Sequence, residues 1–221
     1  PAVDGTVQYA VKTTGSAPVR VTVLDADGNA VASAESAEGT ITIPEVHLWE
    51  PRPGTPYLYA LHVTCGADVY DQTFGVRSIE VRGTQVLLNG KPLYFKGFCK
   101  HEDFTAHGRG FDPVLNVKDV NLIHWANANA VRTSHYPQSP AFLDACDELG
   151  LLVFVEMPGW QHIGDEAWQA QALQNCREMV CQCRNHPSVF LWGVRVNGSS
   201  DNEAFYKRTN EAIHRLDPTR P

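Results

Sequence analysis

The sequence has no long apolar run and no concentration of basic residues. No stretch of its 221 residues approaches the ~20 apolar residues of a membrane-spanning helix, and no secretory signal pattern opens the chain. Lysine and arginine are scattered and the formal net charge is −7, which argues against a nucleic-acid surface. We therefore expect neither a membrane nor a nucleic acid as a partner.

Cysteine is sparse and irregularly spaced. The six cysteines are Cys65, Cys99, Cys146, Cys176, Cys181 and Cys183. Their spacing matches no common zinc motif, so we expect free thiols. Thiols of this kind favour a reducing compartment, and we expect a cytoplasmic protein.

The two ends of the chain suggest a longer protein. The first residue is Pro1 rather than methionine, and Pro221 follows directly after a helix-like segment. We expect both ends to lie within a longer polypeptide. Hydrophobic residues make up 43% of the sequence, which is enough for one large domain or two ordinary ones with cores.

Residues 1–79 alternate between apolar and polar side chains with a period of two. The segment "APVRVTVLDADGNAVAS" predicts two strands joined by a turn at Asp27-Gly28, and "GTITIPEVHLW", "PYLYALHVTC" and "DVYDQTFGVRS" predict further strands. Short strands separated by Gly, Pro and Asp turns indicate an antiparallel β-sandwich. No ionisable groups gather there, so we expect a scaffold domain.

Residues 80–221 follow a different rhythm. A hairpin is indicated at Asn89-Gly90, followed by a strand over Leu93–Cys99 and a helix over Val114–Ala128. Later strands are expected in "ANAVRTSHY", "LLVFVEMP" and "SVFLWGVRVN", each followed by a helix, and Gly150 is the expected stop of the second helix. Four strand-helix units with continuously apolar strands indicate a parallel sheet buried on both faces.

Polar residues follow each of these four strands. They are Lys100-His101-Glu102-Asp103 after the first strand, Arg132, Ser134 and His135 after the second, Glu156 at the end of the third and Asn197 at the end of the fourth. The carboxyl ends of the strands form the active-site face of a β/α barrel. The sequence therefore predicts a functional site where these four strands end.

Several longer motifs resemble the family 2 glycoside hydrolases. They are "FGVRSIE", "LNGKPLYFKGFCKHED", "RTSHYPQSP", "CDELGLLVFVEMPG", "RNHPSVFLWGVRVN" and "LDPTRP". The match runs from about Phe74 to Pro221. It implies an immunoglobulin-like β-sandwich over residues 1–79 and the first (βα)4 half of a TIM barrel over residues 80–221. It also implies a retaining, exo-acting glycosidase.

One position departs from the family pattern. Retaining hydrolysis uses two carboxyl groups about 5–5.5 Å apart, one as proton donor and one as nucleophile. In the family the proton donor is the glutamate of Trp-x-x-x-x-Asn-Glu, whereas this sequence has Trp192, Asn197 and then Gly198. Glu203, in the first turn of the next helix, is not expected to replace it. The family's nucleophile lies beyond Pro221, so we expect this chain to be inactive alone.

The resemblance also implies roles for six side chains. His101 and His135 line the subsite for the terminal sugar, Arg132 orients neighbouring carboxylates, Asn197 contacts the sugar 2-hydroxyl, Glu156 supports the site and Trp160 forms an aromatic platform. Trp192 is a second candidate for the platform, with core packing as its alternative. The expected ligand is a carbohydrate. Some members of the family place metal ligands after the third strand, but here Trp160 lies near where a carboxylate would be needed beside His162, so we expect no metal and no other cofactor.

Four interpretations remain open from the sequence. The chain is a fragment of a β-galactosidase-like enzyme, a fragment of a β-glucuronidase, or a non-catalytic carbohydrate-binding descendant that lost its acid at Gly198. A metal-dependent enzyme built on His101, His135 and His162 is the fourth. "KHED" and "GRGFD" favour β-glucuronidase, whereas "GWQHIGD", "WGVRVN" and "FYKRTN" favour β-galactosidase. A half barrel has open edge strands, so association through them or a homo-oligomer is also expected.

Overall fold

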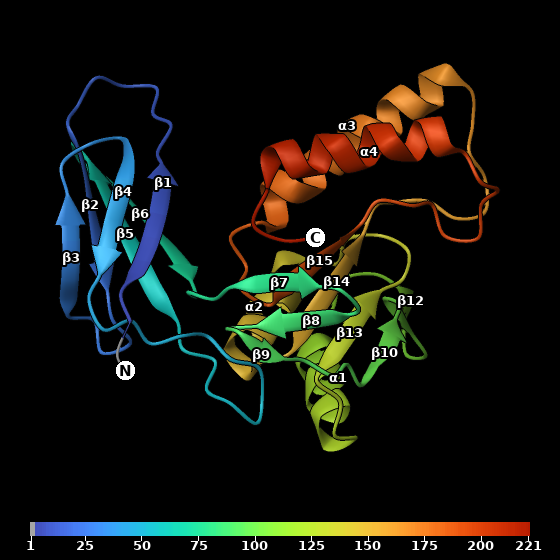
Figure 1. Ribbon diagram of the computed structural model, residues 1–221, viewed down its shortest axis with the longest axis horizontal. Helices are drawn as coiled ribbons and strands as arrows, with labels where there is room; N and C mark the ends of the chain where they lie inside the picture. The colour runs from blue at the N-terminus through green and yellow to red at the C-terminus, as the bar shows by residue number, and fades with distance from the viewer. Residues whose placement is uncertain (1–2) are drawn as a thin grey trace.

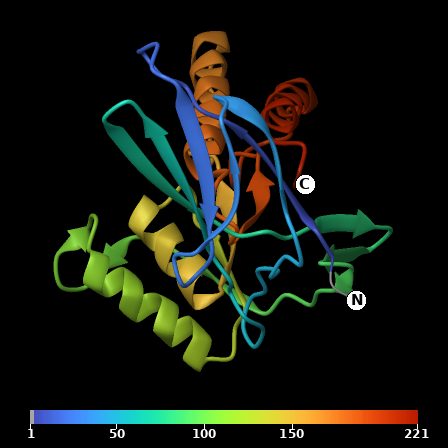
Figure 2. The ribbon, with the colours of Figure 1, turned by 90° about the vertical axis from the view of Figure 1, so that its left-hand side faces the viewer.

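The computed structural model describes residues 3–221 and begins with an antiparallel region. Strands β1 (Gly5–Ala10) and β4 (Glu38–Ile43) pair with each other. A second sheet has the strand order β3-β2-β5-β6. Its strands are β2 (Val19–Leu24), β3 (Ala30–Ala34), β5 (Tyr59–Cys65) and β6 (Asp68–Phe74). Figure 1 shows this region at the left of the molecule and Figure 2 shows it facing the viewer.

The two sheets form an immunoglobulin-like β-sandwich because each has one apolar face. In β2, Val19, Val21 and Val23 are buried and the residues between them are more exposed, as the period of two requires. They pack with Ile41 and Ile43 of β4 in a single core. The predicted sandwich is confirmed, while the boundary between residues 79 and 80 stays a prediction.

The second region contains the parallel sheet. A small antiparallel sheet of β7 (Ile79–Arg82), β8 (Gln85–Leu88) and β9 (Lys91–Pro92) leads into it. The parallel sheet has the order β10-β13-β14-β15, and its strands are β10 (Gly97–Lys100), β13 (Ala130–Thr133), β14 (Leu152–Glu156) and β15 (Val189–Gly193). The short strands β11 (Asp103–Phe104) and β12 (Gly108–Arg109) form a hairpin after β10.

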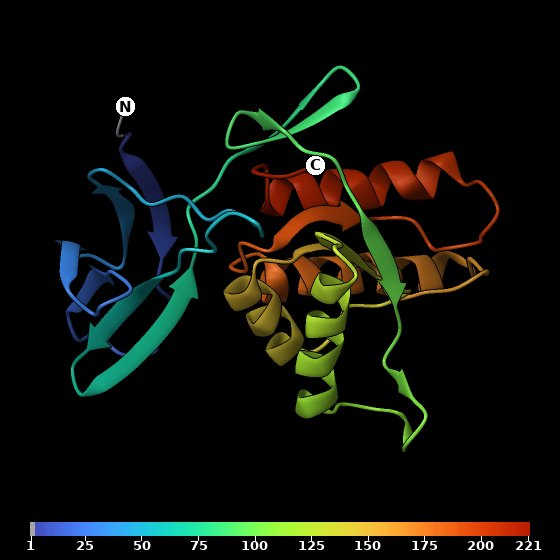
Figure 3. The same cartoon turned by 90° about the horizontal axis from the view of Figure 1, so that it is seen from below.

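Four helices alternate with the parallel strands. They are α1 (Pro113–Trp125), α2 (Pro140–Leu149), α3 (Glu166–Cys183) and α4 (Glu203–Leu216). Helix α1 packs beside α2, and α3 packs beside α4; Figure 3 shows the four helices at the end of the molecule away from the sandwich. Because each strand is followed by a helix, the region has the architecture of the first half of a (β/α)8 barrel.

The helix ends follow from local sequence. Asp112, Ser139, Asp165 and Asn202 are the N-caps of the four helices, and each side chain accepts a backbone N–H hydrogen bond from the first turn. Helix α2 ends at Gly150, whose φ of 72° lies in the left-handed region that glycine adopts readily. The predicted stop at Gly150 is confirmed.

Strands β13, β14 and β15 of the parallel sheet are largely covered on both faces, whereas β10 is exposed over residues 97–99. On one face, Val131, Val153 and Val155 pack against apolar side chains of the helices, including Phe142 and Val180. On the other face, Ala130, Leu152 and Phe190 surround the fully buried Trp49, which lies between β4 and β5 in the chain. Burial on both sides explains the continuous apolar sequences of β13, β14 and β15, while Phe98 of the edge strand β10 is 52% exposed.

Two strands differ in extent from the sequence prediction. The first is shorter than Leu93–Cys99 at its start, because the backbone N–H of Leu93 donates to Val86 of β8 and keeps that residue with the antiparallel sheet. The last ends at Gly193 rather than at Asn197. Asn197 forms an isolated bridge with Trp160 instead, so it is presented by a loop.

The register brings the carboxyl ends of the strands level. Lys100 pairs with Thr133, Arg132 pairs with Phe154, and Glu156 pairs with Gly193. Residues that follow these positions therefore emerge at one edge of the sheet. Because of this alignment, the residues after the four strands can form one site.

Two further features of the described residues concern the cysteines and the helices. All six cysteines are free thiols, and the cytoplasmic location stays a prediction. Within residues 3–221, no helix combines the length and the apolar composition of a membrane span.

Candidate functional site

Four polar side chains meet at the carboxyl end of the parallel sheet. Arg132 is on β13, His135 is two residues beyond that strand, Glu156 ends β14, and Asn197 is in the loop after β15. We call these four residues the carboxyl-end cluster. They come from three consecutive strand-helix units.

Glu156 is the centre of the carboxyl-end cluster. Its Oε1 accepts a hydrogen bond from Nε of Arg132 at 2.6 Å, and its Oε2 lies 2.9 Å from Nδ1 of His135. The backbone N–H of Glu156 donates to Oγ1 of Thr133 at 3.1 Å. Glu156 is only 4% exposed, so its charge is compensated by these partners rather than by water.

Glycine at position 193 makes room for this carboxylate. A Cβ atom placed on Gly193 would lie 2.8 Å from Cγ of Glu156 and 2.9 Å from a ring carbon of Phe154. Both distances are shorter than van der Waals contact. The absence of a side chain on β15 therefore allows Glu156 to lie between β13 and β15.

Asn197 is oriented by two members of the cluster. Its Oδ1 accepts a hydrogen bond from Nη2 of Arg132 at 2.9 Å, and its Nδ2 lies 3.3 Å from Nε2 of His135. Because the guanidinium can only donate, it fixes which side of the amide faces Arg132. The amide N–H2 is thereby directed towards His135 and the open side of the site.

Charge and burial act in opposite directions on Arg132. Partial burial alone would lower the pKa of the guanidinium. The hydrogen bond and the negative charge of Glu156 outweigh this effect, and the pKa of Arg132 is raised. Arg132 is therefore a permanent cation beside Glu156 at neutral pH.

Two further rings border the cluster. The His101 ring lies edge-on to His135 with centroids 5.3 Å apart, and the Trp160 ring lies nearly parallel to His135 at 6.4 Å. Trp160 is 63% exposed, and His101 is exposed as well. The cluster is thus flanked by accessible ring edges and by an aromatic face.

Gly198 lies beside Trp160. Its φ is 70°, and a Cβ atom placed there would meet only Cγ of Gln161 at 3.6 Å, Nε1 of Trp160 at 3.9 Å and Cα of Gln161 at 4.0 Å. Space for a side chain exists, but the left-handed backbone disfavours any residue other than glycine. The position expected to hold a proton donor has no side chain and opens towards the Trp160 face.

The predicted site residues therefore come together. His101, Arg132, His135, Glu156, Asn197, Trp160 and Gly198 lie around one end of the sheet. Trp192 does not join them, because it is buried and its Nε1 donates to Asp217 at 3.0 Å. Gln161 was not predicted from the sequence, although its backbone N–H donates to the Asn197 carbonyl at 2.7 Å. Nothing in the sequence distinguishes Gln161 from a glutamine at the surface.

One group of potential metal ligands occurs among residues 3–221, and it lies elsewhere. Asp144, Asp147 and His186 have ligand atoms within 4.8 Å of one another. Asp147 is already bonded, since its Oδ1 accepts from the backbone N–H of Ser188 at 2.9 Å and its Oδ2 lies 2.6 Å from Nδ1 of His186. His101, His135 and His162 do not form such a group within the described part of the chain.

Two family models match the chain. Residues 2–77 match the model described as glycosyl hydrolases family 2, and residues 79–221 match the model of the family 2 TIM barrel domain. Together they cover nearly the whole sequence. The resemblance to family 2 glycoside hydrolases is therefore supported for the β-sandwich and for the barrel region.

Individual relatives carry two different names. The β-glucuronidase of Rattus norvegicus is 37% identical over 234 residues, covering 98% of this chain and 36% of that protein. The β-galactosidase of Thermoanaerobacter pseudethanolicus is 46% identical over 176 residues, covering 76% of this chain and 24% of that protein. The chain thus spans well under half the length of either relative.

Solved structures show the same fold. A β-glucuronidase of Faecalibacterium prausnitzii has a TM-score of 0.91 and 70% sequence identity, covering 100% of this chain and 40% of that chain. A β-glucuronidase of Ruminococcus gnavus in complex with D-glucuronic acid has a TM-score of 0.88 and 35% identity, covering 97% and 38%. With two family models and these relatives in agreement, the chain belongs to glycosyl hydrolase family 2.

Proposed function

We propose that the carboxyl-end cluster, with His101 and Trp160, binds the terminal sugar of a β-glycoside. In this proposal the chain is the sugar-binding part of a retaining exo-β-glycosidase. The observation that supports it most is the Arg132–Glu156–His135–Asn197 network, in which Glu156 is buried and His135 lies beside the exposed Trp160 ring. Sugar sites in proteins combine an aromatic face with a few fixed polar groups.

Each side chain has a role that fits its chemistry. The Trp160 face offers apolar contact for the C–H groups of a pyranose ring. The ring of His101 offers a donor or an acceptor to a hydroxyl group. Both nitrogens of His135 already face Glu156 and Asn197, so in this proposal His135 borders the sugar and orients the Asn197 amide. The Asn197 amide, held by Arg132 at 2.9 Å, is proposed to bond the 2-hydroxyl, an interaction that strengthens in the transition states of glycosidases.

Gly198 makes the proposed activity of this chain one of binding rather than turnover. General acid/base catalysis contributes about 10²–10⁴-fold to rate, and glycine has no proton to donate. Glu203 does not substitute for it, because its side chain is 82% exposed and pairs with Lys207 at 2.7 Å. The second carboxylate of the reaction is expected beyond Pro221, from the family pattern.

β-D-Glucuronides are the preferred ligands in this proposal. A solved relative at 70% identity over the whole chain is a β-glucuronidase, and a further one is described in complex with D-glucuronic acid. β-D-Galactosides are the second candidates, because a relative at 46% identity is a β-galactosidase. The local motifs support both sugars.

A binding and turnover experiment on the purified chain tests the proposal. We expect p-nitrophenyl β-D-glucuronide to bind in calorimetry, with the galactoside weaker, and no p-nitrophenol to form from the chain or from Gly198→Glu. Trp160→Ala should lose binding and keep its fold by circular dichroism. An Asn197→Ala preparation purified in parallel controls for glycosidases of the expression host.

The possible outcomes separate the parts of the proposal. Absence of binding to both glycosides would overturn the sugar-binding role. Release of p-nitrophenol by the unmodified chain, but not by Asn197→Ala, would overturn the role assigned to Gly198. Stronger binding of the galactoside would replace the first candidate sugar by the second.

A further inference from the structure

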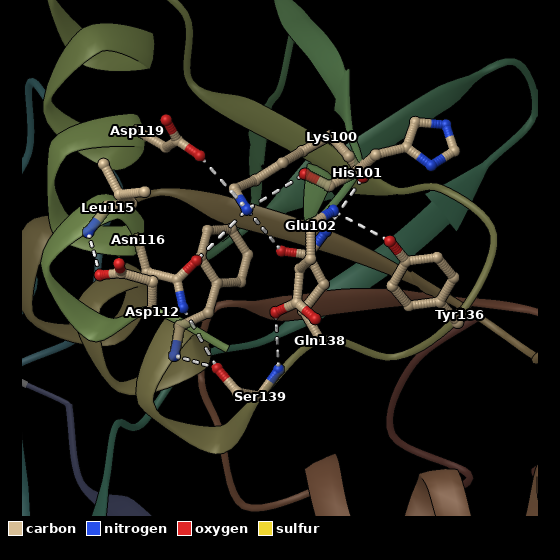
Figure 4. A network of polar contacts seen from close by, with 11 residues as sticks. Lys100, His101, Glu102, Asp112, Leu115, Asn116, Asp119, Tyr136, Gln138 and Ser139 are labelled. Atoms are coloured by element: carbon tan, nitrogen blue, oxygen red, sulfur yellow. Dashed lines mark hydrogen bonds and ion pairs between the residues drawn. The ribbon is translucent and has the colours of Figure 1, made fainter. Parts of the chain in front are cut away.

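The molecule holds a buried lysine directly beside the proposed sugar site. Lys100 ends β10, is 7% exposed, and precedes His101. We propose that Lys100 is a positioning residue that sets the place of His101 relative to His135, and this inference rests on the proposed function. Figure 4 shows the side chain surrounded by polar groups of α1 and of the segment before α2.

The ammonium group of Lys100 joins three segments of the chain. Its Nζ donates to Oδ1 of Asn116 at 3.3 Å and to Oε1 of Gln138 at 3.1 Å, and it pairs with Oδ2 of Asp119 at 3.3 Å. Asn116 and Asp119 are on α1, whereas Gln138 comes just before α2. These acceptors satisfy a charge that burial would otherwise make costly.

Two aromatic rings complete this enclosure. Nζ lies 4.8 Å from the ring centroid of Phe142 and 5.3 Å from that of Phe104. A cation above a ring face is attracted by its quadrupole. Because Phe142 is on α2 and Phe104 is on β11, the lysine also contacts the helix behind the site and the hairpin after β10.

The same network fixes the backbone on which His101 stands. The Lys100 carbonyl accepts from Nε2 of Gln138 at 3.0 Å and from the backbone N–H of Ser134 at 2.9 Å. Gln138 therefore bonds both ends of Lys100, and Ser134 directly precedes His135. Nζ also reaches the His101 carbonyl at 3.5 Å, so the peptide units on both sides of the His101 Cα are held.

A second set of bonds holds the residue after His101. The backbone N–H of Glu102 donates to the Tyr136 hydroxyl at 2.9 Å, and Oε1 of Glu102 accepts from the backbone N–H of Ser139 at 3.4 Å. His101 is thus held from both neighbours, while its own side chain has no polar partner among the described residues. Its edge-on contact with His135 at 5.3 Å is a consequence of how the backbone is anchored.

A buried methionine would fill the same space at lower desolvation cost. Replacing buried ionic groups with apolar residues is often neutral or stabilising when the polar partners are replaced too, while removing one member leaves the others unsatisfied. In this site the charge is shared by α1, the segment before α2 and the His101 carbonyl. The geometry therefore points to a positional role for Lys100 beyond filling the core.

The test compares Lys100→Met with a destabilising variant that touches no polar group. Val120→Ala truncates a fully buried apolar side chain of α1, the helix that also carries Asn116 and Asp119. It serves as the matched control. In Lys100→Met we expect loss of the nuclear Overhauser contact between the His101 and His135 rings and at least about tenfold weaker binding of p-nitrophenyl β-D-glucuronide. In Val120→Ala the inter-ring contact should remain and the affinity should stay within about twofold.

A second variant covers the case in which Lys100→Met does not fold. Gln138→Leu removes the bonds to both ends of Lys100 and leaves the lysine in place, so it should weaken the same inter-ring contact. If the inter-ring contact survives in every folded variant lacking these bonds, the positioning role is wrong. The contact is measured without sugar, so failure of the wild-type chain to bind a glycoside would overturn the proposed function independently.

Discussion

The parallel sheet carries a histidine–carboxylate pair at each end, and the two pairs are in opposite surroundings. At the carboxyl end, His135 lies 2.9 Å from Glu156 beside the exposed Trp160. At the amino end, His186 lies 2.6 Å from Asp147 beneath the sandwich. The same two kinds of side chain therefore occur once beside an exposed aromatic ring and once against the β-sandwich.

The amino-end pair belongs to a network of hydrogen bonds with neighbouring segments. Asp147 accepts from the backbone N–H of Ser188 at 2.9 Å, and its own carbonyl accepts from Nε1 of Trp49 at 2.9 Å. Trp49 is fully buried and comes from the segment between β4 and β5. We call Trp49, Asp147, His186 and Ser188 the amino-end cluster, and we interpret it as the joint between the sandwich and the sheet.

The comparison shows that the neighbours of a pair, rather than its residue types or its own burial, separate a joint from a site. The side chains of His135 and Glu156 are 19% and 6% exposed, and those of His186 and Asp147 are 11% and 4% exposed. A histidine and a carboxylate occur in both clusters, yet only the carboxyl-end cluster adjoins accessible rings and a position without a side chain. Matched substitutions at the two ends can therefore separate stability from binding. The following predictions are ordered by their expected effect on the free energy of unfolding.

The largest loss of stability is expected from Asp147→Asn. The substitution removes the negative charge beside His186. It also replaces one acceptor oxygen by an N–H2 group that faces either the Ser188 N–H or the His186 ring. The expected loss in the free energy of unfolding is about 3 kcal/mol. Chemical denaturation measures the loss, and binding of the glycoside by the folded fraction should be unchanged. Asp144→Asn is the control, because its side chain is 55% exposed and 3.8 Å from His186; a comparable loss there would contradict the assignment of the joint to Asp147.

Gly193→Ala should have the next largest effect. The new Cβ would approach Glu156 Cγ and Phe154 within 2.9 Å, and overpacking of this kind costs about 1–3 kcal/mol. Because Glu156 must move, glycoside affinity should fall as well. Gly110→Ala, where a Cβ meets nothing within 4 Å, should leave both quantities unchanged. Equal stability of the two variants would show that Gly193 is not needed for the cluster.

Glu156→Gln should affect binding more than stability. The substitution keeps the shape of the side chain but weakens its bonds to Arg132 and His135, for a loss of about 1–2 kcal/mol in unfolding free energy. Affinity for the glycoside should fall at least about tenfold, as followed by calorimetry. The reverse pattern, a large stability loss with intact affinity, would place Glu156 in the same class as Asp147.

Gly198→Ala should have the smallest effect. The φ of 70° disfavours a Cβ atom by about 1 kcal/mol, and the space beside Trp160 accepts a methyl group. Thermal and chemical unfolding should reveal a modest loss. Gly15→Ala is the control, because that glycine has no Cβ contact within 4 Å and no positive φ. Identical stabilities of the two variants would mean that the left-handed backbone at residue 198 is not required.

The general arrangement of the site followed from the sequence because it depends on periodicity. Apolar strands that alternate with helices indicate parallel strands, and parallel strands bring their carboxyl ends together. The positions of Arg132, His135 and Glu156 near the ends of their strands were therefore enough to predict that they lie close together. The stop at Gly150 could be predicted as well, because it depends on local backbone preference.

Other features depend on tertiary contacts that no local pattern encodes. Asn197 was expected at the end of a strand, yet β15 ends at Gly193 and Asn197 is held by the Trp160 loop. The Lys100 network joins residues up to 38 positions apart, so spacing along the chain does not reveal it. Gln161 and Gln138 have no feature in the sequence that separates them from surface glutamines.

The most direct test of the central claim is a nuclear magnetic resonance titration of the 15N-labelled chain with p-nitrophenyl β-D-glucuronide. The indole N–H of Trp160 reports on the carboxyl-end cluster, and that of Trp49 reports on the amino-end cluster. We predict saturable shifts for Trp160 and for the rings of His101 and His135, with the Trp49 signal unmoved. Shifts centred on Trp49, or no saturable shift anywhere, would contradict the placement of a sugar site at the carboxyl ends of the strands.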